Sequence, residues 1–64
     1  MQNTEIERLK DQLRESVNKV PKRVTEGGVQ ATRQWLKQRD DALRTLKRVN
    51  VSAQELRAAL GKIQ

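Results

Sequence analysis

Apolar residues recur every three or four positions through the first third of the chain, which predicts an amphipathic helix. On a helical wheel they form a stripe only about 80° wide, made of Ile6, Leu9, Leu13, Val17 and Val20. A stripe this narrow is typical of a coiled-coil seam rather than of a broad globular face. Thr4 and Glu7 have the spacing of a capping box, so we expect this helix to cover about residues 4–19.

Pro21 leaves two alternatives for the end of this first helix. Proline lacks an N–H and its ring crowds the preceding turn, which favours a break after about Lys19. Val24 nevertheless continues the apolar stripe in phase, and this favours a helix that is kinked at Pro21 and runs to about residue 25. Either way, a short connection leads to a second long helix.

Gly27-Gly28 has a different role under each alternative. After a break, Thr25 would cap the second helix, and Val24 and Val29 would pack together as a hydrophobic staple across its first turn. After a kink, the two glycines would form the loop of a helical hairpin. Both alternatives predict two long helices that lie antiparallel.

The second helix is expected over about residues 26–48, and its wheel carries two apolar lines and a basic stripe. One apolar line repeats every seven residues and consists of Val29, Leu36 and Leu43. The other lies about 100° away and consists of Ala31, Trp35, Ala42, Leu46 and Val49. The opposite side of the wheel carries four cations within about 60° of arc, namely Arg33, Lys37, Arg44 and Arg48.

Arg39 lies between the two apolar lines, where an unpaired buried charge would be costly. Three interpretations stay open at this stage. The aliphatic stem can snorkel to the edge of the hairpin. The guanidinium can pair across an oligomer interface with an acid such as Asp11 or Glu15. It can also reach a ligand or a partner protein.

A third, short helix is predicted over about residues 53–60. Ser52 and Glu55 have the spacing of a capping box, and Val51 and Leu56 have the spacing of its hydrophobic staple. Gly61 follows the last apolar position and is expected to end the helix as its C′ residue. An isolated helix of this length is marginal in water, so it must dock on another element.

These elements predict an all-α fold, a helical hairpin of two long helices plus a short C-terminal helix. A chain of 64 residues buries a small core, and without Cys or His it has neither disulfide nor zinc staples. We therefore expect a homodimer that resembles a four-helix bundle. Trp35 would serve either as core or as an interface anchor. The expected interface residues are Leu9, Leu13, Val17, Trp35, Leu36, Arg39, Leu43 and Leu46.

The charge of the chain indicates its class of partner. The net charge is +6, and eight of the 14 Lys and Arg fall in residues 33–64 against three acidic residues. Such an excess favours nucleic acid as the partner, with an acidic protein surface or a merely solvated face as the other interpretations. Duplex is favoured over single strands because the chain has one aromatic residue for stacking. The predicted nucleic-acid-binding residues are Arg33, Lys37, Arg44, Lys47, Arg48 and Arg57.

Composition argues against several other classes. With His and Cys absent, the commonest acid–base group and the best nucleophile are missing, so we expect no enzyme, no cofactor and no metal site. No apolar run is long enough to span a membrane. The basic stripe of the second helix also lacks the bulky apolar neighbours that would bind a membrane surface. The chain start does not have the basic-then-apolar order of a signal peptide, so a cytoplasmic location is expected.

Overall fold

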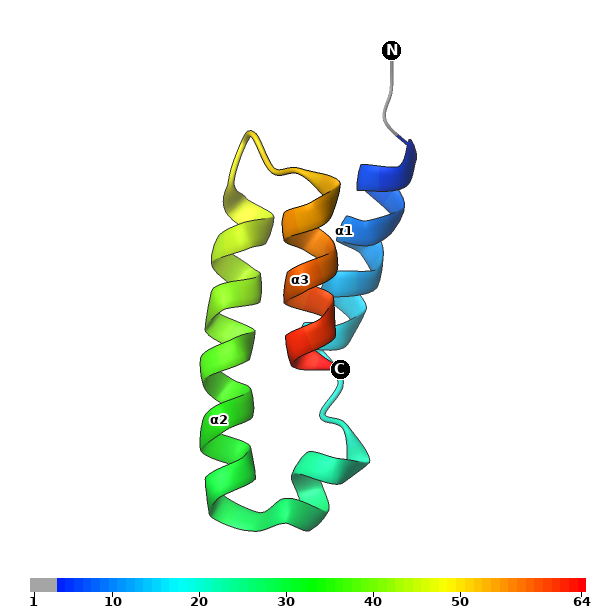
Figure 1. Cartoon of the computed structure of the whole chain (residues 1–64). Helices are drawn as coiled ribbons and strands as arrows, with labels where there is room; N and C mark the ends of the chain where they lie inside the picture. The colour runs from blue at the N-terminus through cyan, green and yellow to red at the C-terminus, as the bar shows by residue number, and fades with distance from the viewer. Residues whose placement is uncertain (1–3) are drawn as a thin grey trace.

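Three helices pack side by side in the computed structural model, which describes residues 4–64. Helix α1 covers Thr4–Val17, α2 covers Lys22–Lys47 and α3 covers Ala53–Ile63. The chain descends along α1, ascends along α2 and descends again along α3 (Figure 1), and its principal extents are 44 × 17 × 16 Å. The predicted all-α class is confirmed, since helix accounts for 84% of the described residues and none of them lies in a strand.

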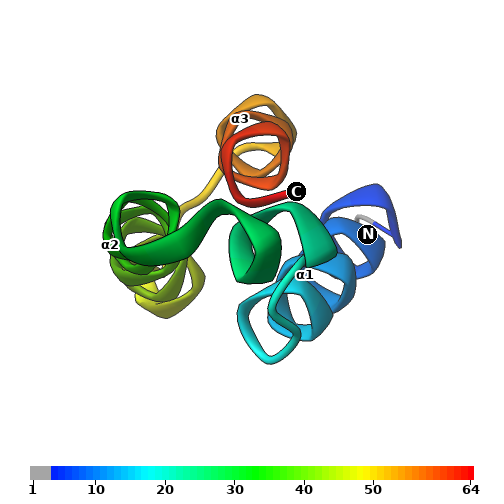
Figure 2. The same ribbon diagram turned by 90° about the horizontal axis from the view of Figure 1, so that it is seen from below.

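The packing of α3 changes the expected architecture. α3 contacts both other helices, and α1 contacts α3 more extensively than it contacts α2. Seen along the bundle, the three helices occupy the corners of a triangle (Figure 2). The apolar core described here therefore lies between the three helices of one chain.

The helix breaks at Pro21, the first of the two alternatives. α1 ends at Val17, and α2 begins at Lys22 with Pro21 as its N-cap residue, at φ −65° and ψ 152°. The predicted start near residue 26 is therefore wrong by about one turn. Proline suits the position ahead of a helix because it has no N–H to leave unpaired. Its carbonyl accepts the amides of Val24 and Thr25 at 3.0 and 3.2 Å, which starts the first turn early.

Gly28 divides α2 into a short first part and a long second part. Its backbone is not helical, at φ 81° and ψ −157°, so residues 22–27 lie across the lower end of the bundle (Figures 1 and 2). The expected staple of Val24 and Val29 is wrong, because Val24 is buried while Val29 is 69% exposed. Thr25 is not the N-cap either; it lies within the first turn, where its hydroxyl donates to the Pro21 carbonyl.

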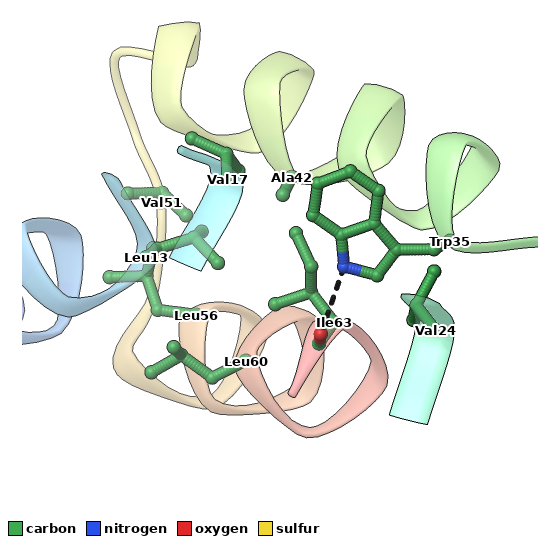
Figure 3. Close-up of a cluster of buried hydrophobic side chains, with 9 residues drawn as sticks. All are labelled: Leu13, Val17, Val24, Trp35, Ala42, Val51, Leu56, Leu60 and Ile63. Atoms are coloured by element: carbon green, nitrogen blue, oxygen red, sulfur yellow. Dashed lines mark hydrogen bonds between the residues drawn. The ribbon is translucent and has the colours of Figure 1, made fainter. Parts of the chain in front are cut away.

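The core is a single cluster that draws on every helix and on the loop before α3 (Figure 3). Its buried members are Leu13, Val17, Val24, Trp35, Ala42, Val51, Leu56, Leu60 and Ile63. The Trp35 indole N–H donates to the Ile63 carbonyl at 3.3 Å, so the one polar atom of the ring is paired inside the core. Burial of this ring among apolar side chains settles its role as core.

α3 begins as predicted and ends later than predicted. The Ser52 hydroxyl accepts the Glu55 amide at 3.1 Å, which confirms the N-cap. The helix continues through Gly61 to Ile63, because burial of the Ile63 side chain holds the extra turn in the core. The Arg23 guanidinium from α2 donates to the Ile63 and Gln64 carbonyls and so satisfies acceptors that the helix end leaves unpaired.

Candidate nucleic-acid interface

The outward face of α2 is defined by the side that α2 buries. Trp35 and Ala42 are buried and point to the core, and residues half a turn away on the wheel must point to solvent. Arg33, Lys37 and Arg44 occupy that opposite side, and all three are exposed. Lys47 and Arg48 flank them and are exposed too. These five cations form the basic face of α2. The wheel predicted four of them on one side of the helix, and Lys47 lies at the edge of that side.

The basic face divides into paired and unpaired cations. Arg44 forms an ion pair with Asp41 one turn earlier in α2, and Arg48 forms one with Glu55 of α3. Within the described part of the chain, Arg33, Lys37 and Lys47 make neither a hydrogen bond nor an ion pair. Exposed ion pairs are weak, about 0–1 kcal/mol, so the two paired arginines can exchange their carboxylates for phosphates. All five cations are thus accessible to an anionic ligand.

Arg57 does not extend the basic face of α2. It lies on α3 and pairs with Glu5 near the start of α1, so it points to the other side of α3 from Arg48. Sequence reasoning grouped Arg57 with the α2 cations by charge alone, because the angle between the helices was not known. In the folded chain this pair links α1 to α3.

A shallow hollow lies beside the basic face, between α2 and α3. Its volume is about 330 Å³, and its cationic lining residues are Arg44, Arg48 and Lys62. Its two carboxylates, those of Asp41 and Glu55, are the ones that pair with the arginines. The hollow therefore adds Lys62 to the accessible cations.

The eight residues expected at an interface differ in how far a single chain buries them. Leu13, Val17 and Trp35 are buried in the core of a single chain, at 0%, 4% and 5% exposed, and present no surface to a partner. Three more pack half-buried against that core, namely Leu9, Leu43 and Leu46. Leu36 is 47% exposed, and with Val29 it remains available to a partner. α3 packs against both α1 and α2, and the buried residues of the three helices form one core.

Arg39 has a structural role that none of the three sequence-based interpretations included. Its Nε donates to the Val17 carbonyl at 2.8 Å, and the side chain is half-buried between α1 and α2. The Val17 carbonyl belongs to the last turn of α1, where carbonyls lack partners within the helix. A positive charge at this end also interacts favourably with the helix dipole. Arg39 thus caps α1 from α2.

We expect Arg39→Met to lower the free energy of unfolding by about 1–2 kcal/mol, because it keeps the stem but removes a charged hydrogen-bond donor. Urea unfolding followed by Trp35 fluorescence measures this. Arg33→Met is the matched control, since Arg33 is an exposed cation of the same helix, and its effect should stay within about 0.5 kcal/mol. Equal stabilities for the two variants would show that the Arg39 contact contributes nothing.

Residues 4–64 hold neither of two other kinds of site. No group of three or more acidic or sulfur- or imidazole-bearing side chains is placed to hold a metal ion in this range. None of its helices combines the length and the apolar character needed to cross a membrane. Comparisons of the chain with models of protein families, with curated proteins and with solved structures found no match.

Proposed function

We propose that this chain is a non-catalytic protein that binds duplex nucleic acid through the basic face of α2. The observation that carries the proposal is the exposure of five cations on the side of α2 that faces away from the buried Trp35, namely Arg33, Lys37, Arg44, Lys47 and Arg48. A row of cations on one rigid helix is the arrangement that neutralises successive phosphates.

The dimensions of the basic face suit this ligand. From Arg33 to Arg48 the face is about 22 Å long, at a rise of about 1.5 Å per residue. A helix of this length fits the major groove of B-form DNA or follows a phosphate backbone. Backbone contact requires no aromatic platform, and the one aromatic ring of the chain is committed to the core. The proposal is therefore for binding that depends on charge and shape more than on base sequence.

Asp40 and Asp41 limit how strongly the face attracts phosphate. Asp41 is paired with Arg44, and Asp40 lies at the edge of the face without a partner among residues 4–64. The region from residue 33 to residue 48 thus keeps a net positive charge, but a moderate one. We accordingly expect modest affinity at physiological salt, in the range of non-specific binding, roughly 10⁻⁴–10⁻⁶ M for one copy of the chain.

The alternative is a protein-interaction module that uses the line from Trp35 to Leu46 or the stripe of α1. Trp35 at 5% exposed and Leu13 at 0% exposed argue against it, because neither side chain is accessible unless the bundle opens. An acidic protein surface could still bind the cations of α2. Such a partner would be distinguished from nucleic acid by affinity capture with and without nuclease treatment.

A salt titration of binding to duplex DNA and duplex RNA tests the proposal. Fluorescence anisotropy with labelled duplexes should give an affinity that falls steeply with salt, with a logarithmic slope near −0.9 for each phosphate contacted. The triple substitution Arg33→Gln, Lys37→Gln and Lys47→Gln should make the slope shallower by roughly 3 and weaken binding at every salt concentration.

The matched control removes the same charge elsewhere. Arg8→Gln, Lys19→Gln and Lys22→Gln alter three exposed cations on α1 and around Pro21, outside the basic face. This control should keep most of the original slope. Equal losses from both triple variants would show that net charge, and not the α2 face, governs binding. An affinity that does not change with salt would reject the proposal outright.

A further inference from the structure

The exposed apolar side chains of α2 form a line along one edge of its basic face. Val29 is 69% exposed and Leu36 is 47% exposed, and Leu43 continues the line half-buried. Their seven-residue spacing places them nearly above one another over about 21 Å of helix. The line lies about a quarter turn from Trp35 on one side and about a quarter turn from Lys37 on the other. We name these three residues the α2 seam.

We propose that the α2 seam is an interface between two copies of this chain, which pair their α2 helices antiparallel about a two-fold axis at Leu36. In this arrangement Leu36 packs against Leu36 of the second copy, and Val29 packs against its Leu43. A two-fold axis makes the interface self-complementary, as an isologous contact requires. Exposed apolar residues at heptad spacing are the usual signature of a helix that pairs with another.

Charges beside the α2 seam favour a second copy of this chain as the partner that binds there. Arg33 lies three residues before Leu36 and Asp40 four residues after it, on the same edge of the seam. The antiparallel arrangement therefore brings Arg33 of each copy opposite Asp40 of the other. Within one chain the two residues are about 10 Å apart along the helix axis, too far to pair. A parallel arrangement would instead put this edge of the two copies on opposite sides of the contact, so that Arg33 and Asp40 would not face each other.

The rest of each bundle leaves room for this contact. α1 and α3 lie on the Trp35 side of α2, about 100° on the wheel from Leu36, and of the three seam residues Leu43 alone packs partly against the core. A two-fold axis perpendicular to both α2 helices also places the basic faces of the two copies on the same side of the helix pair. The dimer therefore presents two basic faces as one broader surface. The dimer contact stands on the seam alone, whereas the use of this joint surface rests on the proposed function.

Sedimentation equilibrium of the full chain without nucleic acid tests the interface. Concentrations from about 10 μM to about 1 mM are needed, since a seam of three apolar side chains per copy is small. The mass should rise towards that of a dimer. Leu36→Glu should raise the dissociation constant at least about tenfold, because it sets two carboxylates against each other at the axis. Val49→Glu is the control: Val49 is 92% exposed and lies outside the seam, and its substitution should leave the constant unchanged.

A charge swap tests the register. Arg33→Asp and Asp40→Arg should each weaken the dimer, because each places like charges opposite across the seam. The double variant should restore it, since the two reversed charges then face each other again. A monomeric wild type at about 1 mM, or a dimer that is indifferent to Leu36→Glu, would overturn the inference. A double variant whose dimerisation is weakened by the sum of the two single effects would also overturn it.

Duplex binding by the same variants separates this inference from the proposed function. A salt-dependent affinity in a chain that never dimerises would leave the proposed function standing and reject the seam. Dimerisation through the seam without any duplex binding would support the seam and reject the proposed function. If both hold, Leu36→Glu should bind with a salt slope about half that of the wild type, because one basic face is then lost from each complex.

Discussion

Leu56→Ala should leave the chain largely unfolded at 25 °C. Leu56 is fully buried on α3, the helix that packs against both α1 and α2, so its side chain lies where the three helices meet (Figure 3). Truncation of a buried Leu to Ala costs about 2–5 kcal/mol, since lost transfer energy and a residual cavity add. A core of this size supplies only about 3–5 kcal/mol in total, so the loss removes most of the stability. Far-UV circular dichroism against temperature measures it.

Leu36→Ala is the matched control for this prediction. Leu36 has the same chemistry but is 47% exposed on the outer surface of α2. At concentrations where the chain is monomeric, its substitution should lower the free energy of unfolding by less than about 1 kcal/mol, which corresponds to a shift in Tm of less than about 8 °C. Similar melting curves for the two variants would mean that Leu56 does not lie at the centre of the core.

The helices themselves were predictable because local signals define them. The cap at Ser52 and the 3.6-residue periodicity of each segment involve only residues that are close in the sequence. They can therefore be found without knowing the tertiary structure. Boundaries that depend on distant contacts were wrong. α3 extends past Gly61 because Ile63 is drawn into a core made with Trp35, about a turn beyond what its own sequence indicates.

The assembly of the helices was less predictable than the helices. A narrow stripe on α1 and two lines on α2 are compatible with a dimer of hairpins or with a three-helix bundle, because either arrangement can bury the α1 stripe and the line that contains Trp35. The choice depends on where α3 docks, and that depends on the turn at Gly28 and on the length of the connection before Ser52. Because α3 packs against the α1 stripe and the α2 line that contains Trp35, the residues left for a partner are the α2 seam and the basic face.

In the candidate site, too, features within one helix were predictable and contacts between helices were not. Four cations of the basic face, Arg33, Lys37, Arg44 and Arg48, belong to α2 or to its C-cap, so the wheel could place them on one side, where all four are exposed. Arg57 lies on another helix, and its pairing with Glu5 could not be predicted from charge alone. The capping contact of Arg39 with the Val17 carbonyl also joins two helices, and its signal in the sequence was a charge at an otherwise apolar position. Such a misplaced charge indicates a contact, without indicating which one.

Gly28→Ala should lower the free energy of unfolding by about 1–3 kcal/mol. The Gly28 backbone at φ 81° and ψ −157° lies in a region that essentially only glycine adopts, and the turn there lets residues 22–27 close the end of the core. Space is not the obstacle, because a Cβ at this position would meet nothing within 4 Å. The cost therefore comes from the backbone alone. Urea unfolding at 25 °C, followed by Trp35 fluorescence, measures it.

Gly61→Ala provides a control with the opposite sign. Gly61 is exposed inside α3, and a Cβ added there would also meet nothing within 4 Å, so alanine should stabilise the helix by about 0.5–1 kcal/mol. A chain of 64 residues is also within reach of chemical synthesis, which allows D-alanine at position 28. Its mirror-image preference matches φ 81°, so the D-residue should retain or increase the stability that L-alanine removes. If L-alanine at position 28 is as stable as glycine, then α2 runs straight through this position, and Val24 cannot reach the core as it does here.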